Sequence, residues 1–357
     1  MMGARQEQAA LTTARRLDDR QRAILRALWD HQVLLTAQIK ILFFSSERRC
    51  QDQMRTLAEL ALVEKDNPSQ SIGVGRAQAQ WTLTETGIQV VAVTMRKPRS
   101  ALDRMPRHTW HRGDKLLEHR LGVNRFFVSL VEASLLFPDH GLQRWAPEKY
   151  HSTTVAGAWI KPDGFGVYQH PGGACHFYLE YDRATEWSRQ LKDKLTRYLK
   201  VALLWAEGEL HHFPNLAVVV PTERREAAFD QALSGVIKEL EVPGKVAVQL
   251  PLFITSEQLL AVRGVLGRVW RQFVPAPGDR PLAAQLLAER LSLVELPVKD
   301  PGPYDLSKCL GRRWTGSTER RRPAPATYPS GKPPPDPAPR RLARPEPGGG
   351  PGGGEAA

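Results

Sequence analysis

Cysteine is scarce in this chain, and the few cysteines present lie far apart. Cys50, Cys175 and Cys309 are the only ones among 357 residues, and none of them belongs to a CxxC pair. Disulfide frameworks and cysteine-based zinc sites both need several cysteines at regular spacing. The sequence therefore excludes both, and a reducing compartment is the simplest expectation.

Long apolar runs are missing as well. The chain has no run of about eighteen or more apolar residues, and its first residues lack the apolar stretch of a signal peptide. We therefore expect a cytoplasmic protein that is neither secreted nor inserted in a membrane. The GxxxxGK[ST] pattern of a phosphate-binding loop is also missing, so the sequence gives no indication of ATP use.

Positive charge is present in excess. The chain has 50 Lys and Arg residues against 38 Asp and Glu residues, a formal net charge of +12, and a pI near 9.8. Such a surplus favours phosphate polyanions as partners, with acidic membrane surfaces as the other option. Composition alone does not choose between them.

Two segments interrupt the globular pattern. Residues 96–112 are rich in arginine and punctuated by proline, which predicts a domain boundary there. In residues 321–357, Pro and Gly occupy 18 of 37 positions, which predicts a disordered tail because apolar surface is too scarce to offset chain entropy. The predicted organisation is a flexible N-terminus (1–16), an N-terminal domain (17–95), a basic linker (96–112), a second domain (113–275), a C-terminal extension (276–320) and the tail (321–357).

Short helices and a strand pair are expected in the first domain. Apolar residues recur at helical spacing behind capping residues, and two short β runs flank a polar, Gly-containing turn. The predicted elements are helices beginning near Asp18, Thr36, Ser45 or Ser46, and Thr84, and strands over Leu62–Glu64 and Ala79–Leu83.

The third of these helices has one apolar and one polar side. Cys50, Met54, Leu57 and Ala61 follow a 4, 3, 4 spacing, which turns the Arg and Gln side chains outward. Such side chains can form paired hydrogen bonds with guanine and adenine or contact phosphates. The predicted DNA-binding residues are Arg48, Arg49, Gln51 and Arg55 on the helix and Arg76 in the turn between the strands.

Three helices followed by two strands resemble the winged helix-turn-helix modules of DNA-binding proteins. The string WTLTETG, Trp81–Gly87, resembles the corner between wing and helix in them. The resemblance covers about residues 18–93 and implies DNA contact. A winged helix used for protein contacts, or an ordinary solvated surface, are the alternatives.

The second domain places two carboxylates on a predicted hairpin. Two β runs, Trp159–Tyr168 and Cys175–Tyr181, flank the loop His170–Gly173, and a register centred on that loop pairs Asp163 with Glu180. Because like charges repel, this pair needs compensation. A bound Mg²⁺ or Mn²⁺ is one option. Neutralisation by a basic side chain is the other, with candidates Lys161, Arg183, Lys192 and Lys194.

Helices surround this hairpin in the predicted order. A long helix is expected after Asp114, another after a Thr185 cap, and two strand-to-helix units follow from Leu216 and from Val246. This order predicts a three-layer α/β domain around a mixed sheet. The predicted fold class is therefore α/β, or α+β for the whole chain.

The hairpin and the helix after it resemble the PD-(D/E)xK nuclease-like core. Pro162–Asp163 supplies the PD pair, and Glu180 supplies the second acid. The resemblance implies that Asp163 and Glu180 bind a metal. The chain departs from the pattern at Asp182, where the family has lysine, so activity would need Lys192 or Lys194 from the next helix. Many members of this fold lack nuclease activity and act only by binding.

The complete arrangement is similar to the bacterial replication-relaxation family. The motifs PDG, LEYDRATE, KLTRY and VVVPTERR follow the N-terminal module in order, over about residues 15–270. The resemblance implies a DNA-binding protein that acts in plasmid replication, DNA relaxation or mobilisation. One alternative is an active metal-dependent nuclease with catalytic Asp163, Glu180 and Lys194. Another is an adaptor that joins a relaxase or a replication initiator to double-stranded DNA.

Overall fold

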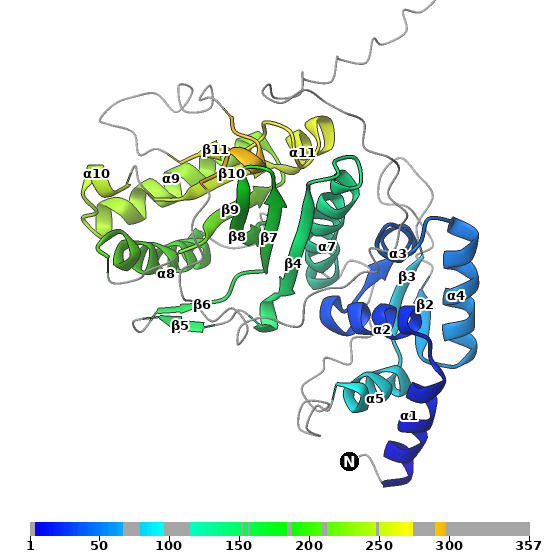
Figure 1. Cartoon of the computed structure of the whole chain (residues 1–357). Helices are drawn as coiled ribbons and strands as arrows, with labels where there is room; N and C mark the ends of the chain where they lie inside the picture. The colour runs from blue at the N-terminus through cyan, green and yellow to red at the C-terminus, as the bar shows by residue number, and fades with distance from the viewer. Residues whose placement is uncertain are drawn as a thin grey trace, which may run out of the picture. The chain divides into compact units, whose positions relative to one another are not determined.

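The computed structural model describes residues 4–66, 79–95, 115–150, 153–155, 158–183, 188–208, 213–247, 250–273 and 290–297. These residues form a mixed α/β structure (Figure 1), and all of them belong to one compact unit, residues 1–319. The predictions for the basic linker, Arg76, Thr185 and the tail lie outside the described residues. In the described part, no helix has both the length and the apolar character needed to cross a membrane.

The N-terminal part consists of helices and a small antiparallel sheet of order β1-β3-β2. Its elements are α2 (Asp19–His31), β1 (Leu34–Leu35), α3 (Thr36–Phe43), α4 (Glu47–Glu59), β2 (Val63–Asp66), β3 (Gln80–Leu83) and α5 (Glu85–Thr94). The Asp18 side chain accepts the backbone N–H of Gln21, and Thr84 accepts that of Gly87. These caps confirm two of the predicted helix starts, because a side-chain acceptor satisfies a donor that the first turn leaves unpaired.

Two features of this part differ from the sequence prediction. Residues 1–16 were expected to be flexible, but residues 4–16 form helix α1 (Ala4–Arg16), which packs along α5 and buries Ala10. A polar sequence of good helix formers needs only such a narrow apolar contact to remain helical. Ala61 was assigned to the buried side of the third helix, but it lies beyond the end of α4 and is exposed.

The second part contains a six-stranded mixed sheet of order β11-β10-β9-β8-β7-β4. Its strands are β4 (Gly141–Pro147), β7 (Gly164–His170), β8 (Gly173–Tyr181), β9 (Asn215–Val220), β10 (Leu252–Ser256) and β11 (Arg271–Gln272). Strands β8, β9 and β10 run parallel, and the remaining pairs are antiparallel. The predicted mixed sheet is therefore confirmed.

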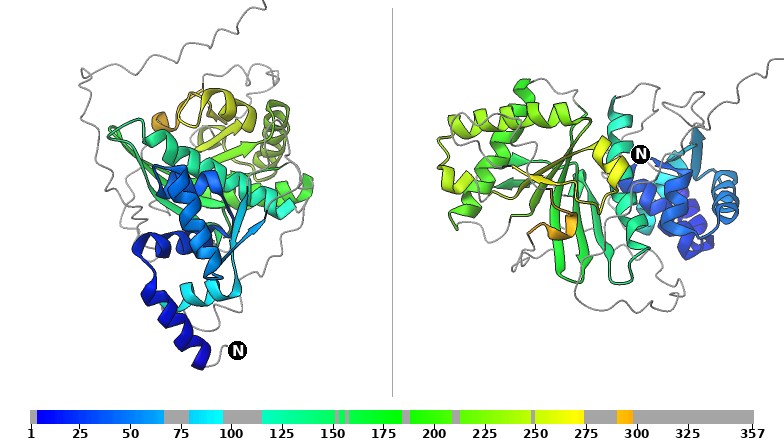
Figure 2. Two further views of the ribbon diagram at one scale, coloured as in Figure 1. Left: turned by 90° about the vertical axis from the view of Figure 1, so that its right-hand side faces the viewer. Right: turned by 90° about the horizontal axis from the view of Figure 1, so that it is seen from above.

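Helices cover both faces of this sheet (Figure 2). Leu216, Val218 and Val220 of β9 pack with helices α8 (Ser188–Ala206) and α9 (Glu223–Glu239). The alternate residues Ala217 and Val219 belong to a core shared with α7 (Lys115–Ser134). Because successive side chains of a strand point to opposite faces, these two sets define three layers, as predicted.

Several boundaries in this part were not predicted. Strand β4 was missed, and the expected strand Trp159–Tyr168 is divided into β6 (Ala158–Ile160), which pairs with β5 (Thr153–Val155), and β7. The break falls at Pro162, which lacks the N–H that a central strand needs. The last predicted helix stops early, because α11 (Glu257–Arg263) ends at Gly264 with φ 77°. The remaining short elements are η1 (Glu148–Tyr150), α10 (Gly244–Ala247) and η2 (Leu293–Glu295).

Hydrogen bonds join the end of α2 to α7 and η1. The buried Asn124 side chain donates to the carbonyl oxygens of Val33, at 2.6 Å, and His31, at 3.2 Å. The Lys149 ammonium donates to the Trp29 carbonyl oxygen at 2.8 Å. The bonds to Trp29 and His31 satisfy carbonyl groups that the end of α2 leaves without an intrahelical partner, and the bond to Val33 satisfies a carbonyl group just beyond that end.

Candidate functional site

The β7–β8 hairpin has the register that the sequence predicts. Gly164 lies opposite Leu179, and His170 lies opposite Gly173, so that the turn itself is only Pro171–Gly172. Asp163 directly precedes β7 and Glu180 lies near the end of β8, which brings the two acids to the same end of the hairpin. The backbone N–H of Tyr181 donates to Asp163 Oδ2 at 2.8 Å and fixes this arrangement.

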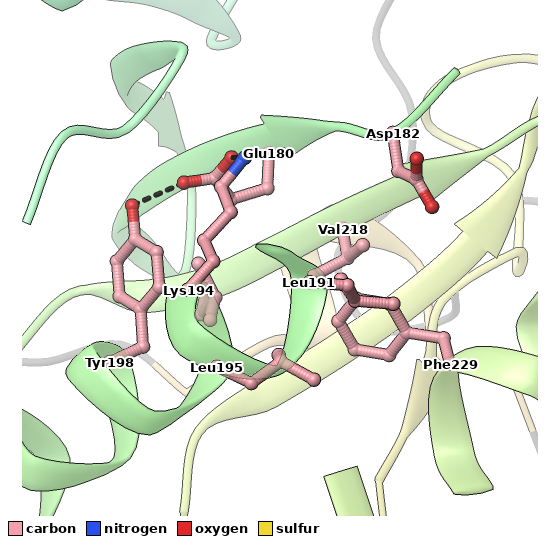
Figure 3. Close-up of a pocket in the computed structure, with 9 residues that line it drawn as sticks. Glu180, Asp182, Leu191, Lys194, Leu195, Tyr198, Val218 and Phe229 are labelled. Carbon is pink, nitrogen blue, oxygen red and sulfur yellow. Dashed lines mark hydrogen bonds and ion pairs between the residues drawn. The ribbon is translucent and has the colours of Figure 1, made fainter. Parts of the chain in front are cut away.

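Helix α8 supplies two partners to Glu180, as Figure 3 shows. Lys194 forms an ion pair with the carboxylate, and the Tyr198 hydroxyl donates a hydrogen bond to it. The two side chains reach the same carboxylate because residues four apart share one face of a helix. Burial raises the pKa of Glu180 to about 8, against the lowering effect of the Lys194 charge. Glu180 therefore holds a proton far more readily than an ordinary glutamate.

The pKa of Asp163 is shifted in the opposite direction to that of Glu180. Burial alone would raise its pKa, but the Lys194 charge, the hydrogen bond to His119 and the Tyr181 N–H together lower the pKa well below its usual range. The contact with His119, on α7, joins Nε2 to Oδ1 at 3.1 Å. The two acids are therefore unequal: Asp163 stays ionised, and Glu180 is the one that takes up a proton.

Only one of the four candidate cations neutralises the acid pair, and it is Lys194. The other three pair with other acids: Lys161 with Glu148 at 2.6 Å, Arg183 with Glu118 at 2.6 Å, and Lys192 with Glu239. Among the described residues, therefore, compensation by a basic side chain is observed at Glu180.

Asp182 occupies the position where the nuclease-like pattern has lysine. It is nearly buried, and its Oδ2 accepts a hydrogen bond from Arg225 Nε at 2.7 Å. Figure 3 shows its carboxylate apart from that of Glu180, across a small pocket. The pocket is lined by Glu180, Asp182, Lys194 and Tyr198 and by the apolar residues Leu191, Leu195, Leu216, Val218 and Phe229. Lys194 can therefore supply a lysine ammonium group to this site, whereas the position after Tyr181 holds the carboxylate of Asp182.

The acid pair matches a magnesium-type donor set only in part. Mg²⁺ is bound through one or two carboxylates, with water and phosphate completing its shell, and Asp163 and Glu180 are two such groups. No group of three or more His, Cys, Asp or Glu side chains that could hold a metal occurs among the described residues. A cation would also have to displace Lys194 from Glu180. The residues therefore fit Mg²⁺ or Mn²⁺ in chemistry, on condition that Lys194 moves.

The predicted DNA-binding side chains of α4 are all exposed. Arg48, Arg49, Gln51 and Arg55 lie on the outer side of the helix, while Cys50, Met54 and Leu57 are buried beneath it. Two of the four have partners on the same helix: Gln51 donates to Glu47 at 3.1 Å, and Arg55 pairs with Asp52 at 3.5 Å. Exposed pairs of this kind contribute little to the stability of the fold, so these side chains can readily exchange their present partner for another.

Three residues of the acid site were not identified from the sequence. Tyr198 lies four residues after Lys194 on a predicted helix, so helical spacing could have found it. His119 and Arg225 come from α7 and α9, far from the hairpin in the sequence, and only packing brings them to Asp163 and Asp182. No local signal marks either of them.

One comparison with known proteins gives a match. Residues 25–214 match the family model described as Replication-relaxation. The matched part is more than half of the chain and includes α4, Asp163, Glu180 and Lys194. No curated protein and no solved structure matches the chain.

Proposed function

The chain belongs to the replication-relaxation family, and from that premise we propose that it binds the duplex DNA of a plasmid or other mobile element. In this role it acts in replication, DNA relaxation or mobilisation of that element. The family match supports the part in replication. The exposed polar side of α4 is the observation that carries DNA binding.

The surroundings of α4 support a winged helix-turn-helix. Helices α2, α3 and α4 are followed by the antiparallel strands β2 and β3, the order of elements in such modules. Cys50, Met54 and Leu57 hold α4 on the core, and Gln21 donates to Gln53 at 3.1 Å. This anchoring leaves Arg49 and Arg55 facing outward, where the helix can enter a major groove.

Selection of a preferred duplex from a random-sequence pool, followed by affinity measurements, tests this function. We expect Arg49→Ala and Arg55→Ala each to weaken binding to the selected duplex by about 1–3 kcal/mol, roughly 5- to 150-fold. Arg263→Ala, which removes an exposed arginine from α11, is the matched control and should leave the affinity unchanged. Unchanged affinity in both α4 variants would contradict the assignment.

A second candidate function is metal-dependent strand cleavage, and the pairing of Lys194 with Glu180 is the observation that favours it. With Asp163 alongside, the site combines the acid, acid and lysine of the PD-(D/E)xK pattern. Asp163 and Glu180 would hold Mg²⁺ or Mn²⁺, which supplies charge stabilisation on a phosphate and an activated water. Tyr198 orients Glu180, and Lys194 is placed to neutralise negative charge beside it.

The adaptor alternative predicts a different outcome at the same site. In that case Lys194 permanently neutralises Glu180, and the α/β part binds a relaxase or a replication initiator. Supercoiled plasmid would then be retarded on a gel but not cut in Mg²⁺ or Mn²⁺, and a partner would co-purify. Conversion to open-circular or linear DNA that is lost in Asp163→Ala and Glu180→Ala would favour cleavage instead.

A further inference from the structure

Helix α8 is more strongly basic than the helix predicted to read DNA. Its described side chains include four cations and one acid: Lys192, Lys194, Arg197 and Lys200 against Asp193. Helix α4 has as many acids as cations: Glu47, Asp52 and Glu59 against Arg48, Arg49 and Arg55. Because its positive and negative charges balance, α4 can read bases but adds little long-range attraction for phosphates. A more basic surface elsewhere would add to the salt-dependent part of DNA affinity.

Two of the α8 cations lack an acidic partner within the described part of the chain. Lys194 pairs with Glu180, and Lys192 pairs with Glu239. Arg197 and Lys200 are exposed and form no ion pair with a described residue. Their charges are therefore available to an external anion.

Packing fixes the direction in which these two side chains point. Leu191, Leu195 and Tyr198 bury one side of α8 against the sheet, so Arg197 and Lys200 lie on the outer side. Lys194 lies at the border between the two sides, partly exposed and in contact with Glu180. From Lys194 to Lys200 the helix advances about 9 Å, over which one DNA strand presents two to three phosphates.

We infer that the outer side of α8, at Arg197 and Lys200, is a second DNA contact that binds the phosphate backbone next to the acid pair. The inference rests on the proposed DNA-binding function and adds a division of roles to it. Arg49 and Arg55 of α4 distinguish sequences. Arg197 and Lys200 bind phosphates of any sequence, because a phosphate contact carries no base information.

Fluorescence anisotropy on two labelled duplexes, the selected one and a mixed-sequence one, tests this inference in the full-length chain. We expect the double variant Arg197→Ala/Lys200→Ala to bind both duplexes about tenfold more weakly. The negative slope of log affinity against log salt concentration should become less steep by about 2. Arg197→Lys/Lys200→Arg keeps both charges and should restore the slope. Lys238→Ala/Arg263→Ala removes two exposed cations from α9 and α11 and is the matched control.

The α4 variants separate this inference from the proposed function. If they weaken binding to the selected duplex while the α8 double variant keeps the slope of the control, the second contact is wrong and the proposed function stands. If the α8 double variant lowers the slope while the α4 variants change nothing, the second contact stands and the role of α4 is wrong. A wild-type chain that binds neither duplex overturns both.

Discussion

Lys194 of α8 forms an ion pair with Glu180 of β8, in a chain whose residue two positions after that glutamate is Asp182. The basic group of the site therefore comes from the next helix, while Asp182 pairs with Arg225. The sequence offers Lys192 and Lys194 as lysines that could reach back from this helix, and Lys194 is the one that contacts Glu180. Lys192 instead pairs with Glu239 on α9.

Lys194 and Lys192 provide a matched pair for testing cleavage. If the chain cuts DNA, Lys194→Ala should lower the rate of supercoiled-plasmid conversion in Mg²⁺ or Mn²⁺ by at least about 100-fold, because a charge beside the reacting phosphate is lost. Lys192→Ala, which removes an equal charge from the same helix, should retain the wild-type rate. Equal loss in both variants would mean that the charge of α8 as a whole matters, and not the contact with Glu180.

Tyr198→Phe should lower the free energy of unfolding by about 1–3 kcal/mol, because the buried Glu180 carboxylate loses a hydrogen-bond donor. Chemical denaturation measures this change. Tyr150→Phe is the control: it removes the same hydroxyl from a contact with Asp30, at 2.9 Å, outside the acid site. Both variants should lose stability, but only Tyr198→Phe should alter plasmid conversion if the site is active. A stable Tyr198→Phe variant would show that its hydroxyl is not needed to satisfy Glu180.

His31 should make the fold sensitive to acid. Burial lowers its pKa from 6.5 to about 3, with the charges of Lys149, Arg120 and Arg26 acting in the same direction and Asp30 opposing them. The unfolded chain therefore binds a proton that the folded chain excludes, and the stability present above pH 6.5 is lost as the pH falls from 6.5 toward 3.

A comparison with His31→Phe isolates this contribution. Phenylalanine keeps a ring that can stack on Trp145, whose ring centre lies 3.6 Å from that of His31, and it cannot take up a proton. Thermal unfolding over this pH range should show a smaller loss of stability in the variant than in the wild type. Parallel curves for the two proteins would mean that other groups cause the acid sensitivity.

Local chemistry in the sequence determined a large part of the fold. Asp18 and Thr84 cap helices at two of the predicted starts, because an N-cap depends only on residues within one turn. The hairpin register followed from the position of its breaker residues, and it placed Asp163 and Glu180 at one end of the hairpin. Helical periodicity likewise predicted that Arg48, Arg49 and Arg55 are exposed, as they are in the structure.

Only the tertiary structure decided how the acid pair is completed. His119 reaches Asp163 because α7 covers one face of the sheet, and Lys194 reaches Glu180 because α8 covers the other. Each contact depends on the rotation of a whole helix, which is set by the many apolar side chains packed beneath it. A sequence pattern shows which side of a helix is apolar, whereas the partner of a charged side chain at its edge is decided only when the layers pack.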